Sequence, residues 1–308
     1  MILAILPYPQ IDPVLIQIGP IAVRWYALSY ITGLLLGWWL IVRMLANKAL
    51  WRSPIFKGKA PASADDIGDL FVWTTLGVII GGRLGYDLFY GTIFCGTWSG
   101  RDCGDLPMGY LHNPLRLIAE WHSATVDLFG WSFHIWVPQL QGMSFHGGLC
   151  GVVVALVLFC RNRKLDVVQI GDLVALAAPI GLFFGRIANF INGELWGKPS
   201  SMPWAMVFPR ADDQPRHPSQ LYEAALEGLL LFGVLQICLR VFRLHNRPGL
   251  LTAIFFTGYG LARFFVEFFR DSESMISGWF SMGMALSFPM WAAAAFFFWY
   301  ALKPRPKP

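Results

Sequence analysis

Arginine and histidine side chains that lie within or at the start of long apolar runs are the residues of this sequence best suited to chemistry. Arg83, Arg186 and Arg263 each stand in such a run, and His146 stands at the start of another. Ionisable residues in apolar spans are costly and are therefore expected at functional sites. A guanidinium offers a planar fork of donors that suits a phosphate, and a histidine accepts a proton near neutral pH. These residues indicate a site that holds an anion and moves a proton.

The elements that must position these residues are apolar segments about as long as a membrane span. Of the 308 residues, 56% are hydrophobic and 14% are charged, against about 25% charged in ordinary soluble domains. This composition argues against disordered, coiled-coil, collagen-like and disulfide-scaffold proteins and against a soluble enzyme. Because about 20 apolar residues cross a bilayer, a helical membrane protein is the simplest remaining class. Seven runs qualify, at 23–42, 68–90, 143–160, 168–191, 220–239, 249–269 and 282–302.

The basic residues predict how these spans are oriented. More than half of the 24 Lys and Arg residues fall in the connections 43–59, 161–164 and 240–247 and in the tail from 303 onward, whereas the long connection 91–142 holds very few. The positive-inside rule places the basic segments in the cytoplasm. An outer N-terminus and a cytoplasmic C-terminus need an odd number of spans, and seven fits. The net charge of +5 is then a topology signal and does not indicate nucleic-acid binding.

We therefore predict an all-α polytopic membrane protein of seven transmembrane helices, with a periplasmic N-terminus and a cytoplasmic C-terminus. Residues 1–308 form one integral membrane domain, with an extended periplasmic loop at 91–142 and a periplasmic head segment at 192–219. The stretch before Arg24 lacks the basic region of a cleavable signal peptide. Cys95 and Cys103 share the long loop and could pair in an oxidising compartment. Metal-ligand spacings are absent from the sequence, so neither a metal nor a cofactor is predicted.

With this orientation, six spans place polar groups in the outer half of the bilayer. Beyond the arginines and His146, the groups at this depth are Arg24, Tyr26, Asp87, Asn189, Glu223, Glu227, Tyr259, Glu267 and Arg270. At about 100° per residue, Tyr259, Arg263, Glu267 and Arg270 form one stripe on their helix. Arg263 with Glu267 and Arg83 with Asp87 have i,i+4 spacing, so each pair can simply neutralise itself. Arg186 has no acid at that spacing and needs a partner from elsewhere, for which a phospholipid phosphate would serve.

His146 and the glycines near it have both a functional and a structural interpretation. His146 is followed by Gly147 and Gly148, which permit close approach of backbone or ligand. A lone histidine is more often a satisfied polar residue, but beside arginines we interpret His146 as a candidate proton acceptor. The glycines of this region also favour close packing of helices.

Several motifs resemble one known family. The run from Gly185 to Gly197, GRIANFINGELWG, resembles the signature of the bacterial phosphatidylglycerol–prolipoprotein diacylglyceryl transferases, and so does the run SFHGG at 144–148. Further blocks match at 216–223, RHPSQLYE, and in the span from Gly258 to Arg270. The opening Asp12-Pro13 and Trp25-Tyr26 pairs fit as well. The blocks follow family order along most of residues 11–289, which makes the set far more specific than one short motif.

The resemblance implies a multi-pass enzyme of the bacterial inner membrane whose active site faces the outer leaflet. It would move the diacylglyceryl group of phosphatidylglycerol to the lipobox cysteine thiol of a preprolipoprotein, the first step of lipoprotein maturation, and release glycerol 1-phosphate. Its partners would be these two substrates and the bilayer, with no nucleic acid. Catalytic roles would fall to His146, Arg186 and Arg263. Lipid and head-group binding would involve Tyr26, Arg83, Arg186, Asn189, Glu194, Gly197, Tyr259, Arg263 and Glu267.

Some features depart from the family pattern, and other functions remain open. Arg24 stands where some relatives carry His, and the loop 91–142 is longer than usual. His146 either deprotonates the thiol or positions the substrates, with the arginines stabilising the thiolate. The main alternative is a transporter or permease for an anionic lipid or small anion, which arginines at one depth would also suit. The lack of internal repeats weakens that alternative, and a serine motif suited to an intramembrane hydrolase is absent from the spans.

Overall fold

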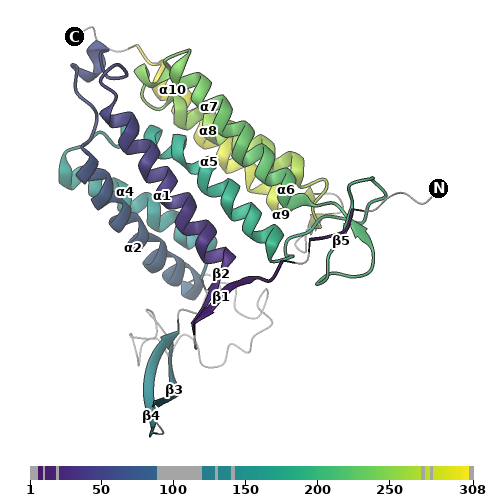
Figure 1. The fold of residues 1–308 in the computed structure, drawn as a ribbon. Helices are drawn as coiled ribbons and strands as arrows, with labels where there is room; N and C mark the ends of the chain where they lie inside the picture. Colours follow the sequence, from purple (N-terminus) through teal and green to yellow (C-terminus); the bar gives the residue numbers. More distant parts are fainter. Residues whose placement is uncertain are drawn as a thin grey trace. The chain divides into compact units, whose positions relative to one another are not determined.

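A computed structural model gives the fold as two compact units (Figure 1). The large unit comprises residues Met1–Ala64 and Val168–Pro308, and the small unit comprises Asp65–Val167. The residues that the structure describes are 6–9, 11–18, 21–88, 120–128, 131–139, 143–271, 275–277 and 280–304. Cys95, Cys103 and most of the predicted loop 91–142 lie outside them.

The large unit is a bundle of long apolar helices. Its helices are α1 (Trp25–Ala46), α5 (Val167–Ile191), α6 (Ser219–Glu223), α7 (Leu231–Arg240), α8 (Leu250–Val266), α9 (Met282–Ala285) and α10 (Ser287–Leu302). A π-helical segment, η4 (Ala224–Leu230), joins α6 to α7 into one continuous rod. Helix α8 packs against α10 and α7, and α1 lies against α5 where Gly33 meets Gly181 (Figure 1).

Short antiparallel hairpins and turns accompany these helices. In the large unit β1 (Val14–Ile18) pairs with β2 (Ile21–Arg24), β5 (Met206–Val207) with β6 (Pro215–Arg216), and β7 (Met275–Ser277) with β8 (Phe280–Ser281). Two 3₁₀ turns, η1 (Pro54–Phe56) and η5 (Leu244–Asn246), lie between long helices. In the small unit β3 (Glu120–Leu128) pairs residue by residue with β4 (Trp131–Gln139).

Two helices of the small unit, α2 (Ala64–Leu88) and α4 (Phe145–Arg163), meet through glycines. Gly77, Gly81 and Gly85 recur every four residues on one face of α2, and Gly147 and Gly151 face them from α4. A Cβ atom at any of these glycines would collide with the backbone of the opposite helix. Small residues let helix backbones approach closely where the surroundings are as apolar as the side chains. The structural interpretation of these glycines is therefore correct.

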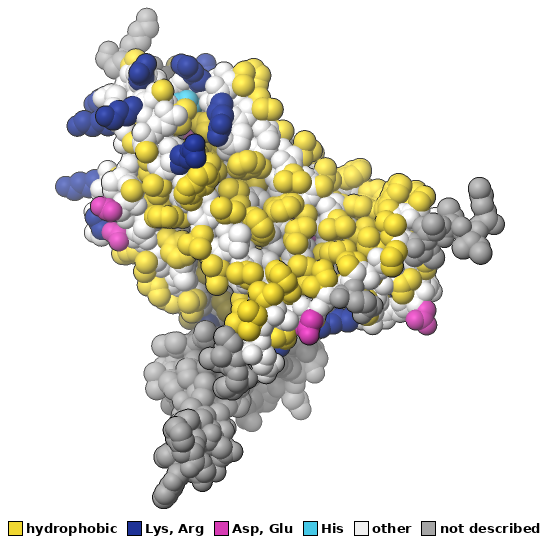
Figure 2. Space-filling model, in the orientation of Figure 1, with side chains coloured by type: hydrophobic (Ala, Val, Ile, Leu, Met, Phe, Trp, Pro, Cys, Tyr) yellow, Lys and Arg dark blue, Asp and Glu magenta, His cyan; other side chains and the backbone are white. Residues whose placement is uncertain are grey.

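All seven apolar runs of the sequence coincide with helices. Six helices of the described residues are long and apolar enough to cross a membrane, and Leu250–Val266 is a shorter apolar helix at the predicted sixth span. The outward side chains are apolar: Ile31, Leu35 and Trp39 of α1 each expose half of their surface or more. Figure 2 shows such hydrophobic side chains over much of the visible helical surface. The chain is thus a mostly helical, multi-pass membrane protein, while the count of seven spans stays a prediction.

One end of the large unit carries a group of basic residues at the ends of its long helices. Helices α1 and α7 finish with Arg43 and Arg240 in their last turns, and Lys303 follows α10. Trp51, after α1, donates from Nε1 to the carbonyl oxygen of Met44 at 3.0 Å. We call the end that carries Arg43, Arg240 and Lys303 the basic end of the large unit. In Figure 2, Lys and Arg side chains gather at one end of the hydrophobic surface.

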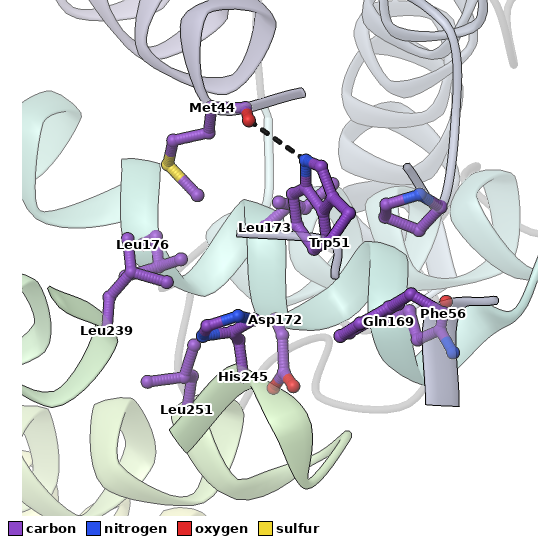
Figure 3. Close-up of a pocket in the computed structure, with 11 residues that line it drawn as sticks. Met44, Trp51, Phe56, Gln169, Asp172, Leu173, Leu176, Leu239, His245 and Leu251 are labelled. Carbon is purple, nitrogen blue, oxygen red and sulfur yellow. Dashed lines mark hydrogen bonds between the residues drawn. The ribbon is translucent and has the colours of Figure 1, made fainter. Parts of the chain in front are cut away.

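A small buried cluster joins the loops of the basic end (Figure 3). His245 of η5 forms a hydrogen bond through Nε2 to the carbonyl oxygen of Leu50 at 2.8 Å and stacks on Phe56. Burial lowers the pKa of His245, so its ring is neutral at pH 7. Asp172 of α5 accepts hydrogen bonds from the backbone N–H groups of Gly249 and Thr252, which caps α8. These contacts fix the loop after α1 and the start of α8 to α5.

Replacing Gly81 with Ala tests the contact between α2 and α4. The new methyl group meets the backbone of α4, and overpacking of this kind costs about 1–3 kcal/mol. We expect Gly81→Ala to lower the melting temperature of the detergent-solubilised protein. Gly68→Ala is the matched control, because Gly68 lies on the same helix with no atom within 4 Å of its Cβ position. An equal loss of stability in both variants would contradict the assignment.

Candidate functional site

A buried cluster of arginines and glutamates lies at the end of the large unit opposite the basic end. We call it the arginine–glutamate cluster. Its residues come from the end of α5, from α6 and η4, and from the end of α8 with the turn after it. The members are Arg186, Glu223, Glu227, Arg263, Glu267 and Arg270. Glu223 and Glu227 have no exposed surface, and Glu267 is 3% exposed.

Glu223 is the centre of the cluster. Its Oε1 accepts hydrogen bonds from Arg263 Nη1 at 2.5 Å and Arg270 Nη1 at 3.1 Å. Its Oε2 lies 3.3 Å from Arg186 Nη1. One carboxylate thus holds three guanidiniums from two long helices and a turn. A buried charge is tolerated only when it is paired and hydrogen-bonded, and Glu223 provides this pairing for all three arginines.

Glu227 holds Arg186 from a second side. Its Oε2 lies 3.2 Å from both Nε and Nη2 of Arg186. Glu227 stands within the π-helical segment η4, and irregular segments of this kind occur frequently at functional sites. The neighbouring Gly228 has no room for a side chain, because a Cβ atom there would lie 2.9 Å from Phe183 Cα. This close approach brings η4 against α5 and lets Glu227 reach Arg186.

Arg263 and Glu267 form the pair that their i,i+4 spacing predicts. Arg263 Nη2 lies 2.9 Å from Glu267 Oε2. A Cβ atom at Gly283 would lie 2.5 Å from that same oxygen, so α9 covers the carboxylate closely. Arg186, which has no acid nearby in its own helix, obtains its acidic partners from the helix that carries Glu223 and Glu227. The sequence grouped these two glutamates with the arginines by their position along the helices but gave no reason to include them in the site.

Asn189, Glu194 and Tyr26 lie close together, next to the end of α5. Asn189 Nδ2 donates to Glu194 Oε1 at 2.7 Å, and Asn192 approaches the same oxygen at 3.5 Å. The turn that carries Glu194 back toward Asn189 uses Gly193 at φ +62°. Tyr26 interacts electrostatically with Glu194 and forms a hydroxyl contact with Tyr30 at 3.1 Å. Three residues predicted for lipid binding therefore share one polar patch.

The predicted residue Gly197 lies in the head segment, where backbone groups are tightly packed. Its N–H donates to the carbonyl oxygen of His217 at 2.8 Å, and a Cβ atom there would lie 2.6 Å from the carbonyl oxygen of Phe269. Arg216 donates to the carbonyl oxygen of Gly197 and pairs with Asp212 and Asp271. The hydrogen bonds from Arg216 lower the pKa of Asp212. Gly197 thus connects the head segment to the end of α8.

Arg83 and His146 belong to the small unit. Arg83 is 2% exposed, and its guanidinium lies over the ring of Tyr86 at 5.8 Å. His146 is exposed in the first turn of α4, whose start is capped by Ser144 accepting from the N–H of Gly147. The side chain of Asp87 lies outside the described residues. The predicted convergence of Arg83 and His146 with the arginine–glutamate cluster stays a prediction.

Glu223→Ala tests whether one carboxylate holds the cluster together. Three guanidiniums, whose side chains are only 15–16% exposed, would lose the buried carboxylate that they share, and breaking a buried pair from one side costs about 3–5 kcal/mol. We expect a large fall in the melting temperature of the purified protein. Asp212→Ala is the control, because the side chain of Asp212 is 40% exposed and its partner Arg216 keeps a second acidic partner, Asp271. A Glu223→Ala protein as stable as the control would refute the central role of Glu223.

Comparison with known proteins gives a consistent family assignment. The family model described as "Prolipoprotein diacylglyceryl transferase" matches residues 13–300. A protein of Allorhizobium ampelinum is 47% identical over 302 residues, which cover 97% of this chain and 92% of the relative. A protein of Rhodospirillum rubrum is 48% identical, covering 98% and 96%, and one of Methylocella silvestris is 46% identical, covering 94% and 93%.

All three relatives carry the name phosphatidylglycerol–prolipoprotein diacylglyceryl transferase. The match runs through every helix of the large and small units, and it includes the residues of the arginine–glutamate cluster. The chain belongs to the prolipoprotein diacylglyceryl transferase family.

Proposed function

We propose that this protein transfers the diacylglyceryl group of phosphatidylglycerol to the lipobox cysteine thiol of a preprolipoprotein. The products are a thioether-linked lipid and glycerol 1-phosphate. The observation that carries the proposal is the family match over residues 13–300 together with relatives of that name at 46–48% identity. The arginines that a multi-pass membrane protein holds on buried glutamates support it, because guanidiniums suit the phosphate of a lipid substrate.

The lipid phosphate binds at Arg186 and Arg263 in this proposal. Both guanidiniums meet at Glu223, so a phosphate near that point reaches two forks of N–H donors. Tyr26, Asn189, Glu194, Tyr259 and Glu267 surround the lipid, and Arg83 adds a third guanidinium from the small unit. Gly197 acts by keeping the head segment close to the end of α8.

The reaction is a substitution at the glyceryl carbon. The thiol loses its proton, because the thiolate is the nucleophile. Sulfur forms a bond to the glyceryl carbon while the carbon–oxygen bond to phosphate breaks, and the electron pair of that bond stays on the phosphate oxygen. Arg186 and Arg263 stabilise the charge that develops there. His146, exposed at the start of α4, accepts the thiol proton or positions the substrates.

In the membrane, seven helices cross with the N-terminus in the periplasm and the C-terminus in the cytoplasm. The basic end of the large unit then faces the cytoplasm, as the positive-inside rule requires. The arginine–glutamate cluster faces the outer leaflet of the inner membrane, where an exported lipoprotein precursor presents its cysteine. The head segment 192–219 lies on the periplasmic side.

The direct test mixes purified protein, phosphatidylglycerol and a lipobox peptide, and follows glycerol phosphate release and peptide mass. We expect release, with Arg186→Ala and Arg263→Ala each lowering the rate about a hundredfold or more, because each removes stabilisation of the leaving phosphate. Arg43→Ala is the control. Arg43 lies in the last turn of α1, at the basic end and away from the arginine–glutamate cluster, so this variant should keep the wild-type rate. Absence of release from the wild-type protein would refute the transferase. Movement of lipid between bilayers without peptide modification would favour the alternative, a lipid transporter.

A reporter fused after Pro308 tests the orientation. We expect a reporter enzyme that is active only in the cytoplasm to be active when fused at Pro308, because the basic segments keep the C-terminus on the cytoplasmic side. A second fusion within the head segment, after Arg210, should give the periplasmic signal. A periplasmic signal from the fusion at Pro308 would overturn the seven-span topology.

A further inference from the structure

The arginine–glutamate cluster is balanced in charge. It holds three guanidiniums and three carboxylates, and the carboxylate residues are at most 3% exposed. Opposite charges buried together stabilise one another, whereas an excess of one sign in a poorly solvated site is costly. A phosphodiester brings one more negative charge. Binding of such an anion therefore requires either that the cluster bear this excess or that one carboxylate lose its charge.

The three carboxylates are not held equally. Glu223 contacts three arginines through its two oxygens. Glu267 pairs with Arg263 at 2.9 Å. Glu227 uses only Oε2, toward Arg186, while its Oε1 is buried without a hydrogen-bond partner among the described residues. Of the two carboxylates that contact Arg186, Glu227 therefore pairs with one arginine and Glu223 with three, so Glu227 has fewer ion pairs to lose when its charge is removed.

The groups around Glu227 also favour its neutral form once an anion arrives. The charged and titratable groups that act on it are Arg186 from α5, Glu223 from α6, and Tyr259 and Arg263 from α8. Glu223 repels a second negative charge, and the compensation comes chiefly from Arg186. A phosphate that binds Arg186 pairs with the positive charge that had stabilised the Glu227 carboxylate. The negative charge of the phosphate also repels that carboxylate. A protonated Glu227, by contrast, gains an O–H donor that can face the anion.

We propose that Glu227 takes up a proton when an anionic phospholipid binds at Arg186, so that the buried cluster stays neutral. In this proposal Glu227 is ionised while it pairs with Arg186 and no anion is bound. A solvent proton converts its carboxylate to the carboxylic acid as the phosphate replaces it at the guanidinium. The proposal rests on the proposed function only in taking phosphatidylglycerol as the anion. It concerns binding, before any bond of the lipid breaks.

Calorimetry on the full chain in detergent micelles tests the proposal. Phosphatidylglycerol is titrated without peptide in two buffers of different ionisation enthalpy, and the difference in heat gives the protons taken up per lipid. We expect uptake that approaches one proton as pH rises, with affinity falling about tenfold per pH unit in that range. Phosphatidylcholine, whose head group is neutral overall, should cause no uptake.

Variants assign the proton to Glu227. Glu227→Gln imitates the protonated side chain, so it should bind phosphatidylglycerol with no proton uptake and with an affinity independent of pH. Glu227→Asp keeps a carboxylate and should restore uptake with a shifted pH midpoint. Asp172→Asn is the matched control: it makes the same change at another buried carboxylate of the large unit, at the basic end, and should keep the wild-type uptake.

Two results would overturn the proposal: no proton uptake by the wild-type protein, or unchanged uptake in Glu227→Gln. If Glu227→Gln does not fold, the wild-type and Glu227→Asp titrations still decide it. Transfer to a lipobox peptide is measured on the same samples to separate this inference from the proposed function. Transfer without linked proton uptake refutes only the inference, whereas uptake without transfer refutes only the transferase.

Discussion

Glu223 and the three arginines around it are the interaction on which the end of the large unit opposite the basic end depends. A guanidinium within an apolar bundle cannot be satisfied by lipid, so each needs an acid from inside the protein. Glu223 meets this need for Arg186, Arg263 and Arg270 at once. Because these arginines come from α5 and from the end of α8, the same carboxylate fixes the two helices relative to each other.

Local irregularities of the backbone follow from this arrangement. The π-helical turn of η4 and the bare backbone at Gly228 bring Glu227 up to Arg186. Gly283 leaves room for the carboxylate of Glu267, and Gly197 holds the head segment beside Phe269. The irregularity at η4 and Gly228 shortens the distance between a charged group, Glu227, and its partner Arg186. The cost of buried charge thus explains features that would be defects in an ordinary helical bundle.

Much of the fold could be predicted from the sequence, because lipid imposes simple rules. The seven apolar runs coincide with helices, and the grouping of Arg43, Arg240 and Lys303 at one end of the large unit agrees with their predicted side. The pair Arg263 and Glu267 also followed from helical periodicity. Contacts between distant helices did not. Arg186 was expected to need a partner from elsewhere, with a bound anion as one possibility, and its nearest partners are Glu223 and Glu227, some 40 residues away in the chain.

The sequence by itself determined which segments are helical, which polar residues share one end of these helices and to which family the motifs belong. These properties depend on composition and on spacing along one helix, where geometry is fixed by 3.6 residues per turn. Only the tertiary structure decided that three arginines share Glu223 and that one oxygen of Glu227 is buried without a hydrogen bond among the described residues. Such pairings depend on the rotation and separation of packed helices. Bulky side chains, glycines and π-helical turns along several helices determine these two properties together.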